Sequence, residues 1–206
     1  MQQLTLVIGS KYTSSWSLRP WMALKIAGLP FDERIVDLDS PDRKALLAAA
    51  SPSAKVPMLI HGDLKIWDSL AICEYVGELA CAQALWPENR GARAVARAIS
   101  AEMHSGFPAM RKHLSMNCKE DFPGFVPPDE ALPDIARVQQ IWREARATYG
   151  VGGDFLFGRW SLADAMYAPV VFRFKGYDVK LDPVCEAYCQ AMLALPAMQQ
   201  WKAESF

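Results

Sequence analysis

The sequence has few of the features that mark extracellular, membrane or metal-binding proteins. It contains five cysteines in 206 residues, and no two of them form a C-x-x-C pair. An odd number of scattered cysteines disfavours a disulfide framework and a zinc site, and is typical of unpaired thiols in a reducing cytosol. No apolar run approaches the ~18 residues of a membrane-spanning helix. The segment Met1–Gln3 lacks the basic residues that begin a signal peptide. We therefore expect a cytoplasmic protein with no membrane partner.

The sequence also has no large excess of positive or negative charge. The formal net charge is −1, so nothing indicates binding to nucleic acid or to an acidic membrane surface. Only three histidines are present. Because His104 and His113 have no third ligand at the spacing of a metal site, we expect no metal.

Two secondary-structure patterns divide the chain. Strand and helix patterns alternate over residues 1–80, and residues 57–60 and 64–67 flank a glycine-containing turn, which predicts a hairpin. The helix between the first two strands predicts that these strands are parallel neighbours. The expected strands are 4–8, 34–38, 57–60 and 64–67, and the expected helices are 17–27, 41–50 and 69–80.

After residue 91 only helical patterns follow. The expected helices cover residues 92–116, 134–149, 161–171, 183–193 and 196–203. Ser161 and Asp164 have the spacing of a capping box, in which each side chain bonds the other residue's backbone N–H. The sequence therefore predicts an α/β domain at residues 1–80 and an all-α domain at residues 91–206, joined by a linker at residues 81–90.

Four short motifs resemble those of one protein family. They are SSWSLRPWMAL at Ser14–Leu24, SPSAKVPML at Ser51–Leu59, DSLAICEYV at Asp68–Val76 and SLADAMYAPV at Ser161–Val170. Their order and spacing resemble the cytosolic glutathione transferases, and the first motif is similar to that of serine-type, zeta-class members. The resemblance implies a thioredoxin-like N-terminal domain, a helical C-terminal domain and glutathione as co-substrate.

The resemblance also implies a catalytic hydroxyl in the first motif. A free thiol has a pKa of about 8.5, so a site that holds the thiolate must supply hydrogen-bond donors and positive potential. A helix N-terminus supplies both. Matching the motif places the catalytic serine on Ser14, with Ser15 and Tyr12 as alternatives, and Ser17 is expected to cap the helix. Trp16, a glutathione-binding candidate, replaces the motif's cysteine and so disfavours disulfide chemistry.

The next two motifs are expected to hold the peptide part of glutathione. The resemblance implies a cis bond between Val56 and Pro57, with the backbone of Val56 paired to the cysteinyl backbone of the tripeptide. Ser69 would bind the γ-glutamyl carboxylate at a helix N-terminus, and Asp68 would face the γ-glutamyl ammonium group. The candidate cations for the glycyl carboxylate are Lys55, Lys44 and Arg43.

The family's substrate pocket lies between the domains, beside the first helix of the C-terminal part. Five residues at helical spacing are candidates there, although such a stripe is also typical of a core. They are Met103, His104, Phe107, Met110 and Arg111.

We expect a transferase that adds the glutathione thiolate to a small electrophile, acting as a homodimer, as the resemblance implies. One alternative is a glutathione-dependent isomerase of an unsaturated diacid, of the maleylacetoacetate type, for which Arg19 and Arg111 could supply cations. The other alternative is a non-catalytic glutathione-binding or scaffold protein of the same fold.

Overall fold

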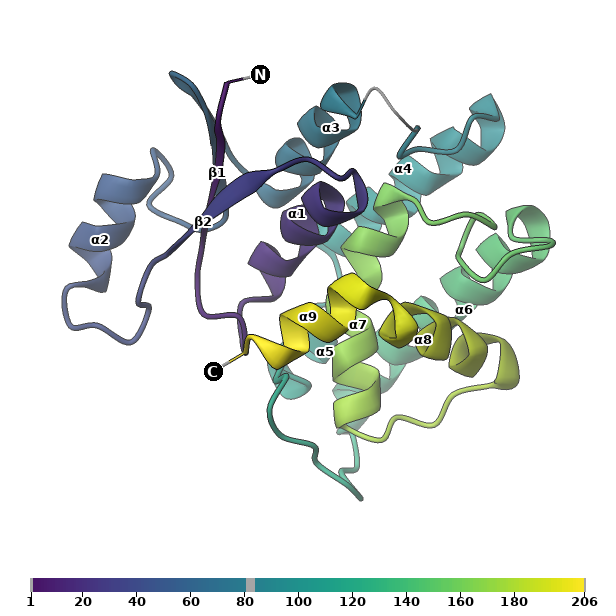
Figure 1. Ribbon diagram of the computed structural model, residues 1–206. Coiled ribbons are helices and arrows are strands. Elements are labelled where there is room, and N and C mark those ends of the chain that lie inside the picture. The colour runs from purple at the N-terminus through teal and green to yellow at the C-terminus, as the bar shows by residue number, and fades with distance from the viewer. Residues whose placement is uncertain (1, 81–83, 206) are drawn as a thin grey trace.

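The chain combines a four-stranded mixed sheet with a larger helical region (Figure 1). The computed structural model describes residues 2–80 and 84–205. The strands are β1 (Leu4–Ile8), β2 (Phe31–Ile35), β3 (Met58–His61) and β4 (Leu64–Ile66). The helices are α1 (Ser15–Ile26), α2 (Arg43–Ala50), α3 (Ser69–Leu79), α4 (Arg90–Ser105), α5 (Pro108–His113), α6 (Leu132–Tyr149), α7 (Leu162–Gly176), α8 (Pro183–Ala194) and α9 (Pro196–Ala203), with a 3₁₀ turn η1 (Asp129–Ala131) before α6.

Strand pairing confirms the thioredoxin-like prediction. The strand order is β2-β1-β3-β4. β1 runs parallel to β2, with Leu4 opposite Phe31, and antiparallel to β3, with Val7 opposite Met58. β3 and β4 form the predicted hairpin, whose turn contains Gly62 at φ +60°, a left-handed conformation that glycine adopts without strain. The fold class is therefore the predicted one.

The sheet separates two hydrophobic clusters. Because successive side chains of a strand point to opposite faces, Leu6 and Ile8 enter the main cluster, whereas Val7 packs in a smaller one with Ala50 of α2. Figure 1 shows α2 on one side of the sheet and α1 on the other, between the sheet and the helical region. The N-terminus of α1 therefore lies where the two parts of the chain meet.

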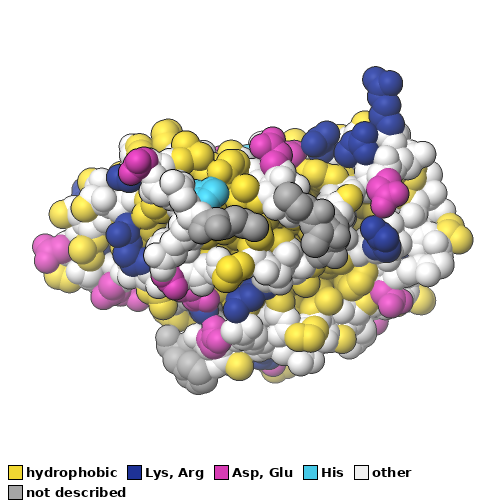
Figure 2. All heavy atoms as spheres, turned by 45° about the horizontal axis from the view of Figure 1, so that its top comes forward, with side chains coloured by type: hydrophobic (Ala, Val, Ile, Leu, Met, Phe, Trp, Pro, Cys, Tyr) yellow, Lys and Arg dark blue, Asp and Glu magenta, His cyan; other side chains and the backbone are white. Residues whose placement is uncertain are grey.

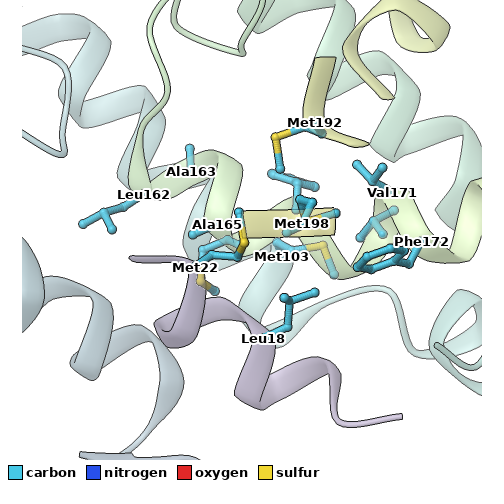
Figure 3. Packing of buried hydrophobic residues seen from close by; sticks show 14 of the residues in the cluster. Leu18, Met22, Met103, Leu162, Ala163, Ala165, Val171, Phe172, Met192 and Met198 are labelled. Atoms are coloured by element: carbon cyan, nitrogen blue, oxygen red, sulfur yellow. The ribbon is translucent and has the colours of Figure 1, made fainter. Parts of the chain in front are cut away.

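Helix α7 forms the centre of the helical region, as its apolar sequence predicts. Every residue from 162 to 174 is buried. Figure 3 shows Leu18 and Met22 of α1 directed toward the part of this core that holds Ala165 and Met103. This shared packing fixes α1 against the helical region.

Some predicted boundaries are wrong. Residues 92–116 form two helices, because Gly106 ends α4 and Phe107 adopts a left-handed φ of 63° before Pro108 begins α5. The second strand covers Phe31–Ile35, three residues before the predicted 34–38. The apolar residues Val36 and Leu38 that suggested the later strand pack in the smaller cluster instead.

The predicted linker at residues 81–90 is only partly described. Residues 81–83 lie outside the described residues, and Arg90 already begins α4. The division into domains at residues 1–80 and 91–206 stays a proposal based on the order of the elements.

Candidate active site

A cavity of about 470 Å³ lies beside the first turns of α1 and α3. Its volume is within the range of ~300–1,000 Å³ typical of small-molecule sites. The lining residues are Trp16, Ser53, Lys55, Val56, Pro57, Trp67, Asp68, Ser69 and His104. Six of the eight residues predicted to bind glutathione lie on this wall, brought together from three separate motifs, whereas the alternative cations Arg43 and Lys44 of α2 do not line it.

Sequence reasoning missed two residues of the wall. Ser53 lies inside the motif that contains Val56 and Pro57, and Trp67 directly precedes Asp68. The signal that could have identified Ser53 and Trp67 was their position beside predicted residues, because neither carries a charge or has a role of its own in a motif.

The N-terminus of α3 presents an unsatisfied donor to the cavity. Asp68 caps this helix, because its Oδ1 accepts the backbone N–H groups of Leu70 at 3.1 Å and Ala71 at 3.4 Å. Ser69 is fully buried, yet its hydroxyl has no hydrogen-bond partner in the described part of the chain. A buried hydroxyl without a partner is costly, so a ligand that accepts from Ser69 would relieve that cost.

His104 reaches this cavity from α4. Its Nε2 lies 3.0 Å from Oδ2 of Asp68, and its ring stands edge-on to Trp16, with centroids 5.3 Å apart. The helical region therefore contributes a side chain directly to the cavity wall, as the prediction of a site between two parts of the chain requires.

The turn before β3 presents open backbone groups. The bond between Val56 and Pro57 is cis, as the resemblance implied. Within residues 2–80 and 84–205, neither the N–H nor the carbonyl oxygen of Val56 bonds to another backbone group. An extended peptide in the cavity could pair with both groups.

At the N-terminus of α1 the structure corrects one prediction and separates the three hydroxyl candidates. The helix begins at Ser15, so Ser14 is its N-cap and the predicted cap at Ser17 is wrong. Ser14 is partly exposed, whereas Ser15 is buried at 6% exposure. Tyr12 faces a different group, since the Lys119 ammonium lies 4.6 Å from its ring centre.

The loop that carries Ser14 is anchored by distant parts of the chain. Lys11, only 6% exposed, pairs with Glu33 of β2 and with Glu204 after α9, both at 2.5 Å. The backbone N–H of Cys118 donates to the carbonyl oxygen of Tyr12 at 3.0 Å. The C-terminal region therefore fixes the loop that precedes the candidate serine.

Two arginines lie against Trp16. The guanidinium carbons of Arg19 and Arg111 are 4.3 and 4.7 Å from a ring centre of Trp16. Arg111 donates to the carbonyl oxygen of Gly106 at 2.9 Å. Arg19 is fully buried, and none of its side-chain nitrogens has a hydrogen-bond partner among the residues that the structure describes. Burial and the nearby charge of Arg111 lower the pKa of Arg19 to about 9, so it stays cationic at neutral pH.

The predicted substrate stripe does not form an open wall. Met103, Phe107 and Met110 are 1%, 5% and 0% exposed and belong to the main hydrophobic cluster. Met103 lies on α4, whereas Phe107 and Met110 lie at the start of α5 and within it, and all three pack in the core instead of lining a pocket. Of the five candidates, His104 lines the cavity, and Arg111 lies beside it against Trp16.

Across the described residues, no helix is long and apolar enough to span a bilayer, and no three potential ligands gather to hold a metal ion. On the face shown in Figure 2, Lys and Arg side chains are interspersed with Asp and Glu side chains and with hydrophobic ones, in keeping with a net charge of −1.

Known proteins resemble this chain in sequence and in structure. Residues 13–79 match the family model described as "Glutathione S-transferase, N-terminal domain". The whole structure resembles a crystal structure of a glutathione transferase homolog from Burkholderia with bound glutathione, at a TM-score of 0.74 and 25% identity, covering 100% of this chain and 98% of that one. Residues 13–79 therefore form a glutathione S-transferase N-terminal domain, and the whole chain has the fold of that family.

Two curated relatives of this chain are named probable maleylacetoacetate isomerases. The protein from Caenorhabditis elegans is 29% identical over 86% of this chain and 82% of its own length. The protein from Vibrio cholerae is 28% identical over 98% of this chain and 97% of its own length. Because each match covers more than four fifths of this chain, the likeness extends beyond the segment that matches the N-terminal domain.

Proposed function

We propose that this protein is a glutathione transferase, which binds glutathione in the cavity of about 470 Å³ and transfers its thiolate to a small electrophile. The observation that carries the proposal is the gathering of six residues from three motifs on one wall. One of them, Trp16, lies in the first turn of α1, two residues after Ser14. Glutathione bound to the Burkholderia homolog supports the same ligand for this chain.

The cavity offers complementary groups for each part of the tripeptide. The γ-glutamyl carboxylate would accept from the unpartnered Ser69 hydroxyl at the positive end of α3. Asp68, already in contact with His104, would face the ammonium group of the same residue. The backbone of Val56 would pair with the cysteinyl residue, and Lys55 would bind the glycyl carboxylate.

The thiolate would be stabilised at the N-terminus of α1. Ser14 supplies a partly exposed hydroxyl at this end, and Arg19 supplies a buried positive charge on the same helix. Lowering the thiol pKa by one unit requires ~1.4 kcal/mol, and one hydrogen bond to a charged group contributes about 1.5–3 kcal/mol. A single serine donor is therefore sufficient for a shift of about one unit.

A second candidate function is isomerisation of an unsaturated diacid with glutathione as cofactor. The likeness to probable maleylacetoacetate isomerases supports it. Arg19 and Arg111 beside Trp16 also support it, because a diacid needs cations that a neutral electrophile does not.

Turnover of the purified protein with glutathione tests both functions. A panel of small electrophiles and an unsaturated diacid separates conjugation from isomerisation. Ser14→Ala should lower turnover by about 10²–10³-fold, the loss expected for one anion-stabilising donor, and Ser15→Ala should lower it far less. Equal, small losses in both variants would reject the serine mechanism and favour Tyr12. Glutathione binding without turnover of any substrate would favour the non-catalytic alternative.

A further inference from the structure

Ser17 occupies an unusual position for a helical serine. It is fully buried in the first turn of α1. Its Oγ accepts the backbone N–H of Gly9 at 3.2 Å and lies 2.7 Å from Oγ of Ser14. The hydroxyl of Ser17 thus connects the end of the β1 segment to the candidate catalytic hydroxyl.

The direction of the Ser14–Ser17 hydrogen bond follows from the number of donors. The Gly9 N–H already donates to Oγ of Ser17, so the Ser17 proton needs an acceptor of its own. Among the described residues, Oγ of Ser14 is the only acceptor within hydrogen-bond distance of that hydroxyl. If Ser14 donated instead, a fully buried proton would be left without a partner, which is the costly arrangement. Ser17 therefore donates to Ser14.

The Ser14 side chain does not cap α1, and Gly9 leaves room for it beside Ser17. An N-cap serine ordinarily accepts a backbone N–H of the first turn, yet the side chain of Ser14 makes no such bond. Gly9 leaves the space that this arrangement needs, because a Cβ at this position would lie 3.3 Å from Oγ of Ser14 and 2.7 Å from Leu38.

We propose that Ser17 is a positioning residue that orients the Ser14 hydroxyl. By donating to Ser14, Ser17 leaves the Ser14 proton free to point toward the cavity. When glutathione binds, the chain of donors runs from the Gly9 N–H through Ser17 and Ser14 to the thiolate sulfur. Each bond in such a chain polarises the next. This inference rests on the proposed function, since it requires that Ser14 contacts the sulfur.

The apparent pKa of the thiol in bound glutathione tests the inference. It is measured by titrating the ultraviolet absorbance of the thiolate in saturated complexes. We expect Ser17→Ala to raise this pKa by about one unit, which is a tenfold loss of thiolate at a pH well below the pKa. Ser17→Thr keeps a hydroxyl and should restore the wild-type value. Ser17→Cys, close in shape but a weak donor, replaces Ser17→Ala if that variant does not fold.

A double variant and a control separate positioning from general structural damage. Because Ser17 acts through Ser14, the variant Ser14→Ala/Ser17→Ala should have the same thiol pKa as Ser14→Ala alone. Ser100→Ala is the matched control, since Ser100 is also fully buried in a helix and donates to the Ala96 carbonyl oxygen at 2.7 Å. It should leave the thiol pKa unchanged.

Each contrary result has a distinct meaning. If Ser14→Ala raises the thiol pKa while Ser17→Ala does not, the positioning role is refuted and the proposed function stands. Additive shifts in the double variant would also refute it, because Ser17 would then act independently of Ser14. If Ser14→Ala leaves the thiol pKa unchanged, the serine mechanism itself is wrong, and the role of Ser17 is refuted with it.

Discussion

Replacing Asp164 should destabilise the protein by an amount that depends strongly on pH. Asp164 is fully buried in the first turn of α7, where the predicted capping box is present. Its Oδ2 accepts the backbone N–H of Ser161 at 2.8 Å and the Ser161 hydroxyl at 3.0 Å, and its Oδ1 accepts the Leu156 N–H at 3.2 Å. Loss of a cap costs about 0.5–2 kcal/mol, and these buried donors have no water to replace the carboxylate.

The pH dependence follows from the pKa of Asp164. Burial raises that pKa from 3.8 to about 6, although the hydrogen bonds from Leu156 and Ser161 oppose the rise. Because the folded state holds the proton more tightly, this contribution to stability is fully present below pH ~4 and is lost as pH rises through about 6. The full difference is about 3 kcal/mol at ~1.4 kcal/mol per unit. The cost of Asp164→Ala should therefore be about 1.4 kcal/mol larger at about pH 5 than at about pH 7.5.

Urea unfolding at the two pH values measures this cost. Asp182→Ala is the matched control, because Asp182 caps α8 by accepting the N–H groups of Val184 and Cys185. Burial raises the pKa of Asp182, but hydrogen bonds from Cys185 and Arg143 outweigh it and leave the pKa lowered. The contribution of Asp182 to stability is lost only as pH falls through its lowered pKa, which lies below 3.8. The cost of Asp182→Ala should therefore not grow at pH ~5. If Asp164→Ala keeps its stability at both pH values but loses glutathione affinity, the capping interpretation is refuted.

Three other predictions follow from the site. Glu204→Gln removes one partner of Lys11 and should cost about 1 kcal/mol of stability and lower turnover at saturating glutathione. Glu186→Gln is the control: Glu186 is about as exposed as Glu204 and pairs with Lys175 away from the loop, so turnover should not change, and equal turnover in both variants would refute the anchoring role. Arg19→Met should keep or raise the melting temperature, because it removes a buried charge without a hydrogen-bond partner, and a large drop in melting temperature would contradict this expectation. The same variant should raise the pKa of the bound thiol, because it removes a positive charge from α1. The protein should sediment as a homodimer, and a single species of 22.9 kDa at micromolar concentration would rule this out.

Local patterns in the sequence predicted most of the sheet and most of the cavity wall. The apolar run 4–8 is β1, and the turn at Gly62 forms the hairpin because glycine suits its positive φ. The residues Val56, Pro57 and Asp68 were found because each belongs to a motif with a fixed order of side chains. Trp67 has no such order around it and was missed.

Tertiary packing decided what the sequence could not show. Helical periodicity cannot distinguish a core face from a pocket wall, so Met103 and Met110 were assigned to a pocket although both are buried against the helical core. The break at Phe107 depends on a left-handed φ, which ordinary propensities disfavour for a bulky residue. The cap of α1 was placed at Ser17 because any of several serines could serve, and only the observed start of the helix at Ser15 places the cap on Ser14.

The most direct measurement of the central claim is the position of glutathione in a crystal of this protein. The proposal predicts the tripeptide in the cavity between Val56 and Ser69, with its sulfur within hydrogen-bond distance of Oγ of Ser14 and its γ-glutamyl carboxylate on Ser69. Glutathione bound elsewhere, or bound in the cavity with its sulfur on Tyr12 or away from every hydroxyl of the α1 N-terminus, would contradict the proposal.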